Sequence, residues 1–392
     1  MKFSQEFYKI ILFIIFFLIL WSISQMIESN DNFKELKPKI GNWVDAYFAD
    51  PIFMAEHIPQ KFIQQKTPYN ITYMQDVPSI YVNLIKKYIL HTDQSNKIDF
   101  SSFLDPLSKE LDVSERSSKM HIVISPEGTT GAIRAFYYAV QQMEKKKITV
   151  KSCVKPPYYT LHKKLTHFVP ECEWQSNDQG KADIEVVVSP NNPTGELLKP
   201  TGKAKYVILD SVYDKPLFSN QTISVNPWKY EAYKNPHFLE VSSFSKLGYA
   251  GVRVGYAVTS NTKIAELMTE YFKTSALGLN AWAMKNFEAN YDTIMNLKWD
   301  QMIYKKLKQR HKEIRKWIPS KLITSNDRIP LILTKIPKSY YDKFEIKSRG
   351  GTEFDVSDDV ARLNLMLSNE DWKELIKRIS SNEFQKGIKN FN

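Results

Sequence analysis

The sequence predicts an α/β fold in which a large domain with a mostly parallel sheet precedes a smaller α+β domain. Between residues 120 and 260, short apolar runs typical of buried strands alternate with helical patterns. Polar and glycine-containing turns follow several of these runs, as expected where strands end at a binding edge. After residue 260 the sequence becomes mainly helical, with two further strand patterns.

The composition is that of a globular protein with a sizeable core. Of its 392 residues, 43% are hydrophobic and 25% are charged. The net charge is +11, but the lysines are spread along the chain without an arginine-rich block, so we predict no nucleic-acid partner. Cys153 and Cys172 match no zinc spacing, and we predict no metal site; one disulfide between them stays open.

The N-terminus carries a separate hydrophobic segment. Residues 10–21 are all apolar, and further apolar residues extend the run to residue 27. This approaches the length of about 20 residues that crosses a bilayer. We predict that residues 1–29 are a signal anchor whose residues 10–27 form a single membrane helix; a cleaved signal peptide and a buried core helix are the alternatives. An anchor would place the protein in the endoplasmic reticulum or the secretory pathway, in an undecided orientation.

The remaining chain is divided into three predicted segments. Residues 30–95 contain one helical pattern, at residues 80–89, and are predicted to contribute to the small domain and to a dimer contact. The large domain is predicted to span residues 96–262, with a short helix at residues 103–111. Residues 263–392 are predicted to form the C-terminal small domain.

A strand, a turn and a helix open the predicted sheet. Residues 121–125 form a buried strand pattern and residues 132–142 a helical one. The turn between them contains Gly128, Thr129 and Thr130. Glycine lets the backbone approach a ligand, threonine can donate its hydroxyl, and a helix N-terminus attracts an anion. We predict an anion-binding turn here; an ordinary strand-to-helix turn is the alternative.

Polar side chains follow the next strand patterns. The patterns at residues 147–153 and 184–188 precede PPYY at 156–159 and SPNNPTG at 189–195. The two tyrosines suit stacking on a planar ring, although a loop packed on the core would use them equally well. Asn192 can donate its amide to a phenolate oxygen.

The strand pattern at residues 206–209 ends in Asp210, and Tyr213 follows. A carboxylate is costly to bury unpaired, so Asp210 is expected either to face solvent or to pair with a cation. A protonated pyridine nitrogen is such a cation. Tyr213 could reach the same phenolic oxygen as Asn192.

Residues 241–257 (VSSFSKLGYAGVRVGYA) contain the lysine around which the site is predicted. Lys246 lies between serines and a glycine-containing turn, and Arg253 follows. Small residues let a bulky ring approach, and serine hydroxyls with an arginine would hold a phosphate. This pattern indicates pyridoxal 5′-phosphate in Schiff-base linkage to Lys246. A surface lysine in a glycine turn is the alternative.

The predicted small domain is mainly helical. Helical patterns lie at residues 263–272, 281–289, 299–317 and 369–379. The first strand pattern lies at residues 331–336. A second, alternating strand pattern at residues 361–366 carries Arg362. An arginine on a strand can clamp a carboxylate, and a surface arginine on an edge strand is the alternative.

Four motifs together resemble those of fold-type I pyridoxal-phosphate enzymes of the aminotransferase superfamily. They are SPNNPTG at 189–195, DSVY at 210–213, SFSK at 243–246 with Gly251 and Arg253, and Arg362. Within the superfamily the chain is most similar to the alliinase and tryptophan-aminotransferase-related family. That narrower resemblance rests on ITYMQD at 71–76, PPYY, TSALGLN at 274–280 and residues 350–366. It spans about residues 70–380 and implies the fold-type I architecture.

The resemblance implies a role for each candidate. Lys246 would bind the cofactor covalently and shuttle a proton, and Asp210 would keep the pyridine nitrogen protonated. Asn192 and Tyr213 would bind the phenolate oxygen, and Tyr159, or failing it Tyr158, would stack on the ring. The phosphate would be held by Gly128, Thr129, Thr130, Ser243 and Arg253.

The substrate and the assembly follow in the same way. Arg362, with Asn192, would bind the substrate's α-carboxylate. Tyr73 would reach the phosphate of a neighbouring subunit, which implies a homodimer with shared active sites. The resemblance therefore implies partners that are small molecules, an amino acid and a 2-oxo acid.

The implied reaction is transfer of the amino group of an L-amino acid, with aromatic ones such as tryptophan among the candidates, to a 2-oxo acid. A C–S lyase of the alliin type would use the same residues. With two cysteines in the chain, the cysteine-rich module of alliinases is absent, which argues against the lyase. A membrane-anchored pseudoenzyme that binds partners is a third hypothesis, and the presence of Lys246, Asp210 and Arg362 argues against it.

Overall fold

The computed structural model describes residues 44–45, 73–74, 84–89, 120–176, 180–219, 224–247, 253–276, 278–294 and 297–391. The predicted membrane helix at 10–27 and the predicted helix at 103–111 lie outside these residues. Within them, no helix combines the length and the apolar character needed to cross a membrane. Residues 84–89 are helical, inside the pattern predicted at 80–89.

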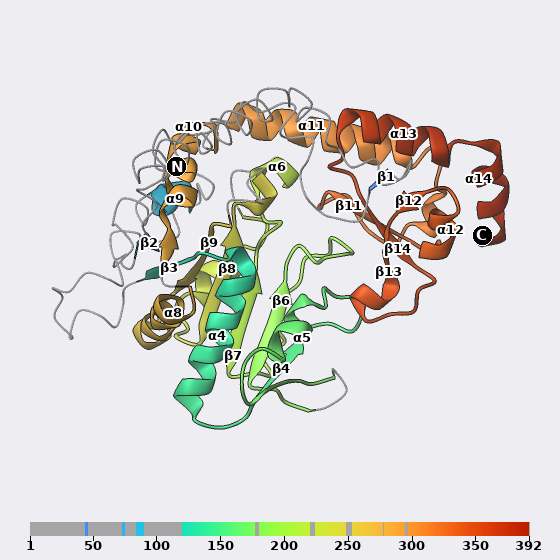
Figure 1. The fold of residues 1–392 in the computed structure, drawn as a ribbon. Helices are drawn as coiled ribbons and strands as arrows, with labels where there is room; N and C mark the ends of the chain where they lie inside the picture. Colours follow the sequence, from blue (N-terminus) through green and yellow to red (C-terminus); the bar gives the residue numbers. More distant parts are fainter. Residues whose placement is uncertain are drawn as a thin grey trace, which may run out of the picture. The chain divides into compact units, whose positions relative to one another are not determined.

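Among the described residues, seven strands form one sheet in the order β3-β9-β8-β7-β6-β4-β5 (Figure 1). Strands β8, β7, β6, β4 and β5 pair in parallel, and β9 is antiparallel to both of its neighbours. The prediction of a mostly parallel α/β sheet is confirmed. The strands are β3 (His121–Ser125), β4 (Ile148–Ser152), β5 (Cys172–Trp174), β6 (Ile184–Val188), β7 (Tyr206–Asp210), β8 (Phe238–Ser243) and β9 (Gly255–Thr259).

Alternate residues of these strands are buried on opposite faces of the sheet, as a parallel sheet requires. In β6, Val186 and Val188 belong to the core beneath helices α4 (Gly128–Glu144) and α8 (Thr262–Ser275), whereas Val187 belongs to the other core. Ile133, Phe136, Tyr137 and Val140, the apolar positions of the helical pattern predicted at 132–142, are all buried in α4. The helix begins at Gly128 rather than at residue 132, so the predicted turn residues Thr129 and Thr130 belong to its first turn.

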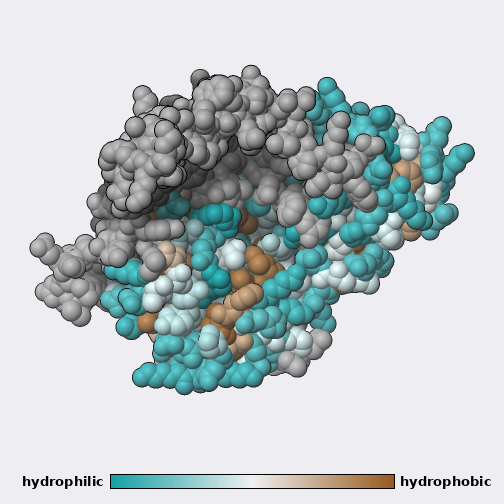
Figure 2. Space-filling model, viewed as in Figure 1, coloured by the Kyte–Doolittle hydropathy of each residue, from teal (hydrophilic) through white to brown (hydrophobic). Residues whose placement is uncertain are grey.

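The core on the opposite face also contains Leu217 of α6 (Pro216–Ser219), Phe287 of α9 (Ala281–Ala289) and Ile303 of α11 (Leu297–Ile314). Most of the described surface seen in Figure 2 is hydrophilic. Of the large hydrophobic side chains in the described part of the chain, Phe168 and Leu197 are exposed. Shorter elements complete this region: α5 (Leu161–Thr166), α7 (Lys229–Ala232), the 3-10 turn η4 (Ser245–Leu247), α10 (Tyr291–Ile294), and β10 (Leu279–Asn280), which pairs with β2 (Tyr73–Met74).

A separate antiparallel sheet, in the order β11-β14-β13, lies in the C-terminal part of the chain. The predicted strands near residues 331 and 361 and the helix at 369–379 are present, while two-residue β13 was not predicted. The boundaries of the predicted segments 30–95, 96–262 and 263–392 stay predictions. The elements are β11 (Leu331–Thr334), α12 (Lys338–Asp342), β12 (Ile346–Lys347), which pairs with β1 (Val44–Asp45), β13 (Arg349–Gly350), η7 (Gly351–Phe354), β14 (Ala361–Asn364), α13 (Asn369–Ile379) and α14 (Asn382–Gly387).

A fully buried arginine joins α11 to the small sheet. Arg310 donates hydrogen bonds of 2.7 Å to the carbonyls of Leu365 and Leu367, which follow β14. Its guanidinium also lies 4.9 Å from the ring centroid of Trp372 on α13. Hydrogen bonds from a charged donor to buried carbonyls are strong, so this side chain fixes the helix to the sheet.

The two cysteines are both free. Cys172 pairs in register with Ile148, the first residue of β4, whereas Cys153 follows the last residue of that strand. The disulfide that the sequence left open therefore does not form, because the two cysteines lie at opposite ends of neighbouring parallel strands.

Next to Arg310 on α11, the buried His311 predicts a pH dependence of stability. Its Nε2 donates to the carbonyl of Ile329 at 2.9 Å, and burial lowers its pKa to about 4. Between pH 6.5 and 4, the unfolded chain binds a proton at this residue that the folded protein does not. As the pH is lowered from 6.5 to 4, the free energy of unfolding should therefore decrease, by up to about 3 kcal/mol from this group.

This is tested by urea unfolding of wild type and His311→Gln between pH 7 and 4.5. The wild-type curve should lose more stability than the variant as the pH falls. The same substitution at the exposed His167 is the matched control. Parallel curves for wild type and His311→Gln would contradict the assignment.

Candidate active site

Most predicted site residues gather at the carboxyl ends of the parallel strands. Asp210 is the last residue of β7, Ser243 is the last residue of β8, and Asn192 follows β6 by four residues. All three line one cavity of about 190 Å³. Carboxyl ends of parallel strands lie at the same edge of a sheet, which is where α/β proteins bind ligands.

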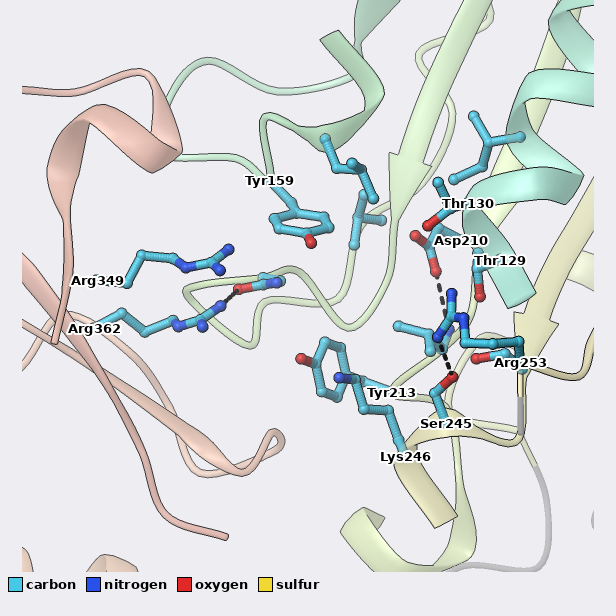
Figure 3. Close-up of a pocket in the computed structure, with 16 residues that line it drawn as sticks. Thr129, Thr130, Tyr159, Asp210, Tyr213, Ser245, Lys246, Arg253, Arg349 and Arg362 are labelled. Atoms are coloured by element: carbon cyan, nitrogen blue, oxygen red, sulfur yellow. Dashed lines mark hydrogen bonds between the residues drawn. The ribbon is translucent and has the colours of Figure 1, made fainter. Parts of the chain in front are cut away.

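One end of the cavity is built to bind an anion. Thr129 and Thr130 line it from the first turn of α4, a helix of 17 residues, and Arg253 lines it from the segment before β9 (Figure 3). The Oγ1 atom of Thr129 is buried without a hydrogen-bond partner. A buried hydroxyl, a guanidinium and a helix N-terminus together form a donor set that suits a phosphate.

Close backbone packing holds this end in shape. The Gly128 N–H donates to the carbonyl of Arg253 at 2.9 Å, and Gly128 has a φ of 66°. A Cβ atom added to Gly255 would lie 2.4 Å from the carbonyl carbon of Gly128, so a side chain there would push the two segments apart. Gly128 thus shapes the cavity without lining it.

The Arg253 guanidinium is held by two protein groups, one before α4 and one in η4. Its Nη2 donates to the carbonyl of Glu127 at 2.8 Å, and its Nη1 lies 3.5 Å from the Ser245 hydroxyl. Ser245, which was not predicted, lines the cavity together with the predicted Ser243. The arginine is therefore positioned by protein groups before any ligand binds.

Lys246 lies in the 3-10 turn η4, and its Nζ is 6.0 Å from the ring centroid of Tyr213. Tyr213 is buried, and burial raises the pKa of its phenol well above the usual value, against the opposing effect of Arg362 and Arg349. The phenol therefore keeps its proton at neutral pH and can act as a hydrogen-bond donor.

Asp210 accepts a hydrogen bond from a histidine that was not predicted from the sequence. His162 on α5 is buried, and its Nε2 donates to Asp210 Oδ2 at 3.2 Å. The hydroxyl of Tyr137 on α4 lies 3.2 Å from His162 Nδ1. In the sequence His162 stands in a lysine-rich stretch without a recognisable pattern, so no local signal could have identified it.

The two tyrosines of PPYY have different environments. Tyr159 lines the cavity. Tyr158 is buried outside it, where its hydroxyl donates to Asp355 and accepts from Trp174 Nε1 at 3.2 Å. Of the two alternatives, Tyr159 is thus the one available to a ligand.

The other end of the cavity carries two arginines. Arg362 on β14 is buried, and its Nη1 donates to Asn192 Oδ1 at 3.0 Å. Because the amide oxygen of Asn192 accepts this bond, its NH2 group is the part that can donate to a ligand. Arg349 on β13, which was not predicted, also lines the cavity. It lies on a strand too short to give a periodic signal.

Two predicted features stay predictions. Tyr73 is paired through its backbone with Asn280, and its proposed role concerns a second subunit. Gly251 lies outside the described residues.

The charges of the cavity lining are strongly unbalanced. Lys246, Arg253, Arg349 and Arg362 are cationic, and Asp210 is the single carboxylate among the described lining residues. Pyridoxal 5′-phosphate requires a lysine for its aldehyde, donors for its phosphate and a carboxylate for its pyridine nitrogen. Lys246, the N-terminus of α4 with Arg253, and Asp210 at the end of β7 are such groups, so the residues fit this cofactor.

Sequence comparison finds one family and several relatives that match parts of this chain. The family described as Allinase matches residues 112–328. Tryptophan aminotransferase-related protein 3 of Arabidopsis thaliana is 29% identical over 173 residues, which are 40% of this chain and 35% of that protein. The chain thus spans about a third of that relative's length. An L-serine phosphate decarboxylase of Campylobacter jejuni is 23% identical over 310 residues, 69% of this chain and 76% of that protein.

Solved structures agree on the fold. A Methanococcus jannaschii protein, whose active site is described as similar to those of kynurenine aminotransferases, has a TM-score of 0.62 at 14% identity and covers 94% of this chain and 96% of its own. A pyridoxal-phosphate-bound putative aminotransferase of Clostridium difficile has a TM-score of 0.59 at 13% identity and covers 89% and 96%.

The family match covers more than half of the chain, and the structural matches cover nearly all of it. Family and fold together imply pyridoxal 5′-phosphate as the cofactor, which the residues of the cavity fit. The chain belongs to the alliinase family and has the fold of the fold-type I pyridoxal-phosphate aminotransferases.

Proposed function

We propose that this protein is an aminotransferase that moves the amino group of an L-amino acid to a 2-oxo acid. The observation that carries the proposal is the convergence of Lys246, Asp210 and Arg362 on one cavity, at whose far end Thr129, Thr130 and Arg253 form a donor set that suits an anion. A lysine, a carboxylate and a carboxylate-binding arginine are the groups that transamination needs.

The cofactor is held by residues of the large domain. Thr129, Thr130, Ser243 and Arg253 would bind its phosphate, and Tyr159 would stack on its ring. Asp210 would pair with the pyridine nitrogen, and the hydrogen bond from His162 keeps the carboxylate oriented. Asn192 and Tyr213, both donors, would bind the phenolic oxygen. When bound, pyridoxal 5′-phosphate supplies the electron sink for charge that develops on the substrate's α-carbon.

The substrate is oriented from the small domain. Arg362 would bind the α-carboxylate, which fixes the direction of the bond between the α-carbon and its hydrogen. Lys246 Nζ would then be the base that takes this proton from the α-carbon and the acid that delivers it to C4′ of the cofactor. The burial of Arg362 and of Asn192 beside it excludes water from the carboxylate.

The remaining predictions belong to the same proposal. A homodimer with shared sites would bring Tyr73 to the phosphate of the other subunit. The relatives named for tryptophan aminotransferase support aromatic amino acids as candidate donors. Residues 10–27 remain the predicted membrane anchor.

A second candidate is a C–S lyase of the alliin type, which the description of the matching family favours. The same residues would bind the substrate. The reaction would differ because, after proton removal, a β-substituent would leave before Lys246 delivers the proton to C4′.

One experiment separates these reactions. The cofactor-loaded protein is titrated with a panel of L-amino acids while the visible absorbance of the bound cofactor is recorded. Loss of the absorbance with an amino acid, and its recovery with a 2-oxo acid, would support transamination. Unchanged absorbance with release of ammonia and a 2-oxo acid would assign the lyase. Release of carbon dioxide would assign the decarboxylation for which the Campylobacter relative is named.

Lys246→Ala should abolish covalent binding of the cofactor and lower transamination by about 10²- to 10⁴-fold or more, because the acid–base group is lost. Absorbance spectra and turnover with the best donor measure both effects. Lys263→Ala, an exposed lysine on α8, is the control and should retain both. A normal covalent-cofactor spectrum in Lys246→Ala would refute the assignment.

His162→Phe should weaken cofactor binding about tenfold or more, because the buried Asp210 loses the side-chain hydrogen bond that orients it and keeps the one from the Val212 backbone. Tyr137→Phe removes only the outer hydrogen bond of this chain and should have a smaller effect. Titration of the cofactor-free variants with pyridoxal 5′-phosphate measures the dissociation constants. Equal constants for wild type and His162→Phe would show that His162 does not position the carboxylate.

A further inference from the structure

Two arginines lie opposite each other on neighbouring strands, and both line the cavity. Arg349 of β13 is in register with Arg362 of β14 in the antiparallel pair. Figure 3 shows both side chains extending from the small sheet toward the cavity that Tyr159 lines. Like charges directly opposite each other destabilise a sheet, so this arrangement indicates a site that receives negative charge.

The proposed function accounts for one of the two arginines. The α-carboxylate of an amino acid carries a single negative charge, and the buried Arg362, fixed by Asn192, is suited to it. Arg253 lies at the opposite, phosphate-binding end of the cavity, and its guanidinium is anchored there to the carbonyl of Glu127. Arg349 therefore adds a positive charge on the substrate side that neither the cofactor nor the α-carboxylate requires.

The position of Arg349 suits a group beyond the α-carboxylate. Arg362 is fully buried, whereas Arg349 is only partly buried. Both arginines act on the buried Tyr213, whose pKa they lower against the larger effect of burial, so their positive potential extends into the cavity. A guanidinium binds a carboxylate or a phosphate through two parallel hydrogen bonds.

We propose that Arg349 binds a second negatively charged group on the side chain of the substrate. The preferred amino acids or 2-oxo acids would then carry an acidic or a phosphorylated side chain. This inference rests on the proposed function and specifies its substrate class. The competing explanation is that both arginines hold the α-carboxylate, in which case Arg349 would act on all amino acids alike.

The test measures equilibrium binding to the full-length, cofactor-loaded protein by calorimetry and by absorbance. The ligands form matched pairs that differ in one charge: L-glutamate and L-glutamine, L-aspartate and L-asparagine, O-phospho-L-serine and L-serine. Wild type should bind the charged member of at least one pair more tightly. The pair with the largest preference identifies carboxylate or phosphate as the group bound.

Arg349→Gln should lower affinity for that charged ligand by about 10- to 100-fold and leave its neutral partner almost unaffected, because a charge-assisted hydrogen bond is lost. Arg349→Lys should restore part of the affinity, since the charge remains without the planar fork. Lys347→Gln, an exposed cation two residues away, is the matched control and should change neither constant.

Two results would overturn the inference. Equal losses for charged and neutral ligands in Arg349→Gln would assign Arg349 to the α-carboxylate. Equal affinity of wild type for the charged and neutral members of every pair would also reject the inference. This result needs no variant, so it holds even if Arg349→Gln does not fold. Failure of the proposed function would look different, because the absorbance of the bound cofactor would not be lost with an amino acid and recovered with a 2-oxo acid, whichever member of a pair binds.

Discussion

The site depends on one backbone contact, where the first turn of α4 meets the start of β9. Gly128 donates its N–H to the carbonyl of Arg253, and Gly255 leaves no room for a Cβ atom against the Gly128 carbonyl. Strands β3 and β9 are neighbours, with Ser125 in register with Gly255, so the sheet itself enforces this approach. Because of it, the helix N-terminus and the Arg253 guanidinium converge on one point. A bulkier residue at either glycine would separate the two parts of the anion site.

Burial of polar groups sets the second constraint on the cavity. Asp210 ends a buried strand, and the cost of burying its carboxylate is offset by hydrogen bonds from His162 and from the backbone N–H of Val212 at 3.1 Å. Arg362 is buried on the opposite side and donates to Asn192. Asp210 and Arg362 each have hydrogen-bond partners of their own in the protein and do not pair with each other. The space between them stays polar and preorganised, which a reaction that develops charge on a substrate requires.

The sequence predicted this framework well because its signals are local. The strands at 121–125 and 184–188 and the helices at 281–289 and 369–379 have the predicted bounds, since hydrophobic periodicity reports burial directly. The residues that gather in the cavity could also be predicted, because most of them stand in turns directly after strands. His162 and Arg349 could not. Each acquires its place through tertiary packing, on a helix of six residues and a strand of two, which are too short to carry a period.

The small sheet that carries both arginines has a consequence for how this protein can diversify. The family match ends at residue 328, whereas β11, β13 and β14 all lie after residue 330. The groups that would hold the cofactor thus lie within the matched residues, whereas the two arginines on the substrate side lie on a separate sheet that follows them. Mutations in β13 and β14 could alter selectivity while the residues that would hold the cofactor stay unchanged. Such a division lets evolution explore new substrates without first losing the catalyst.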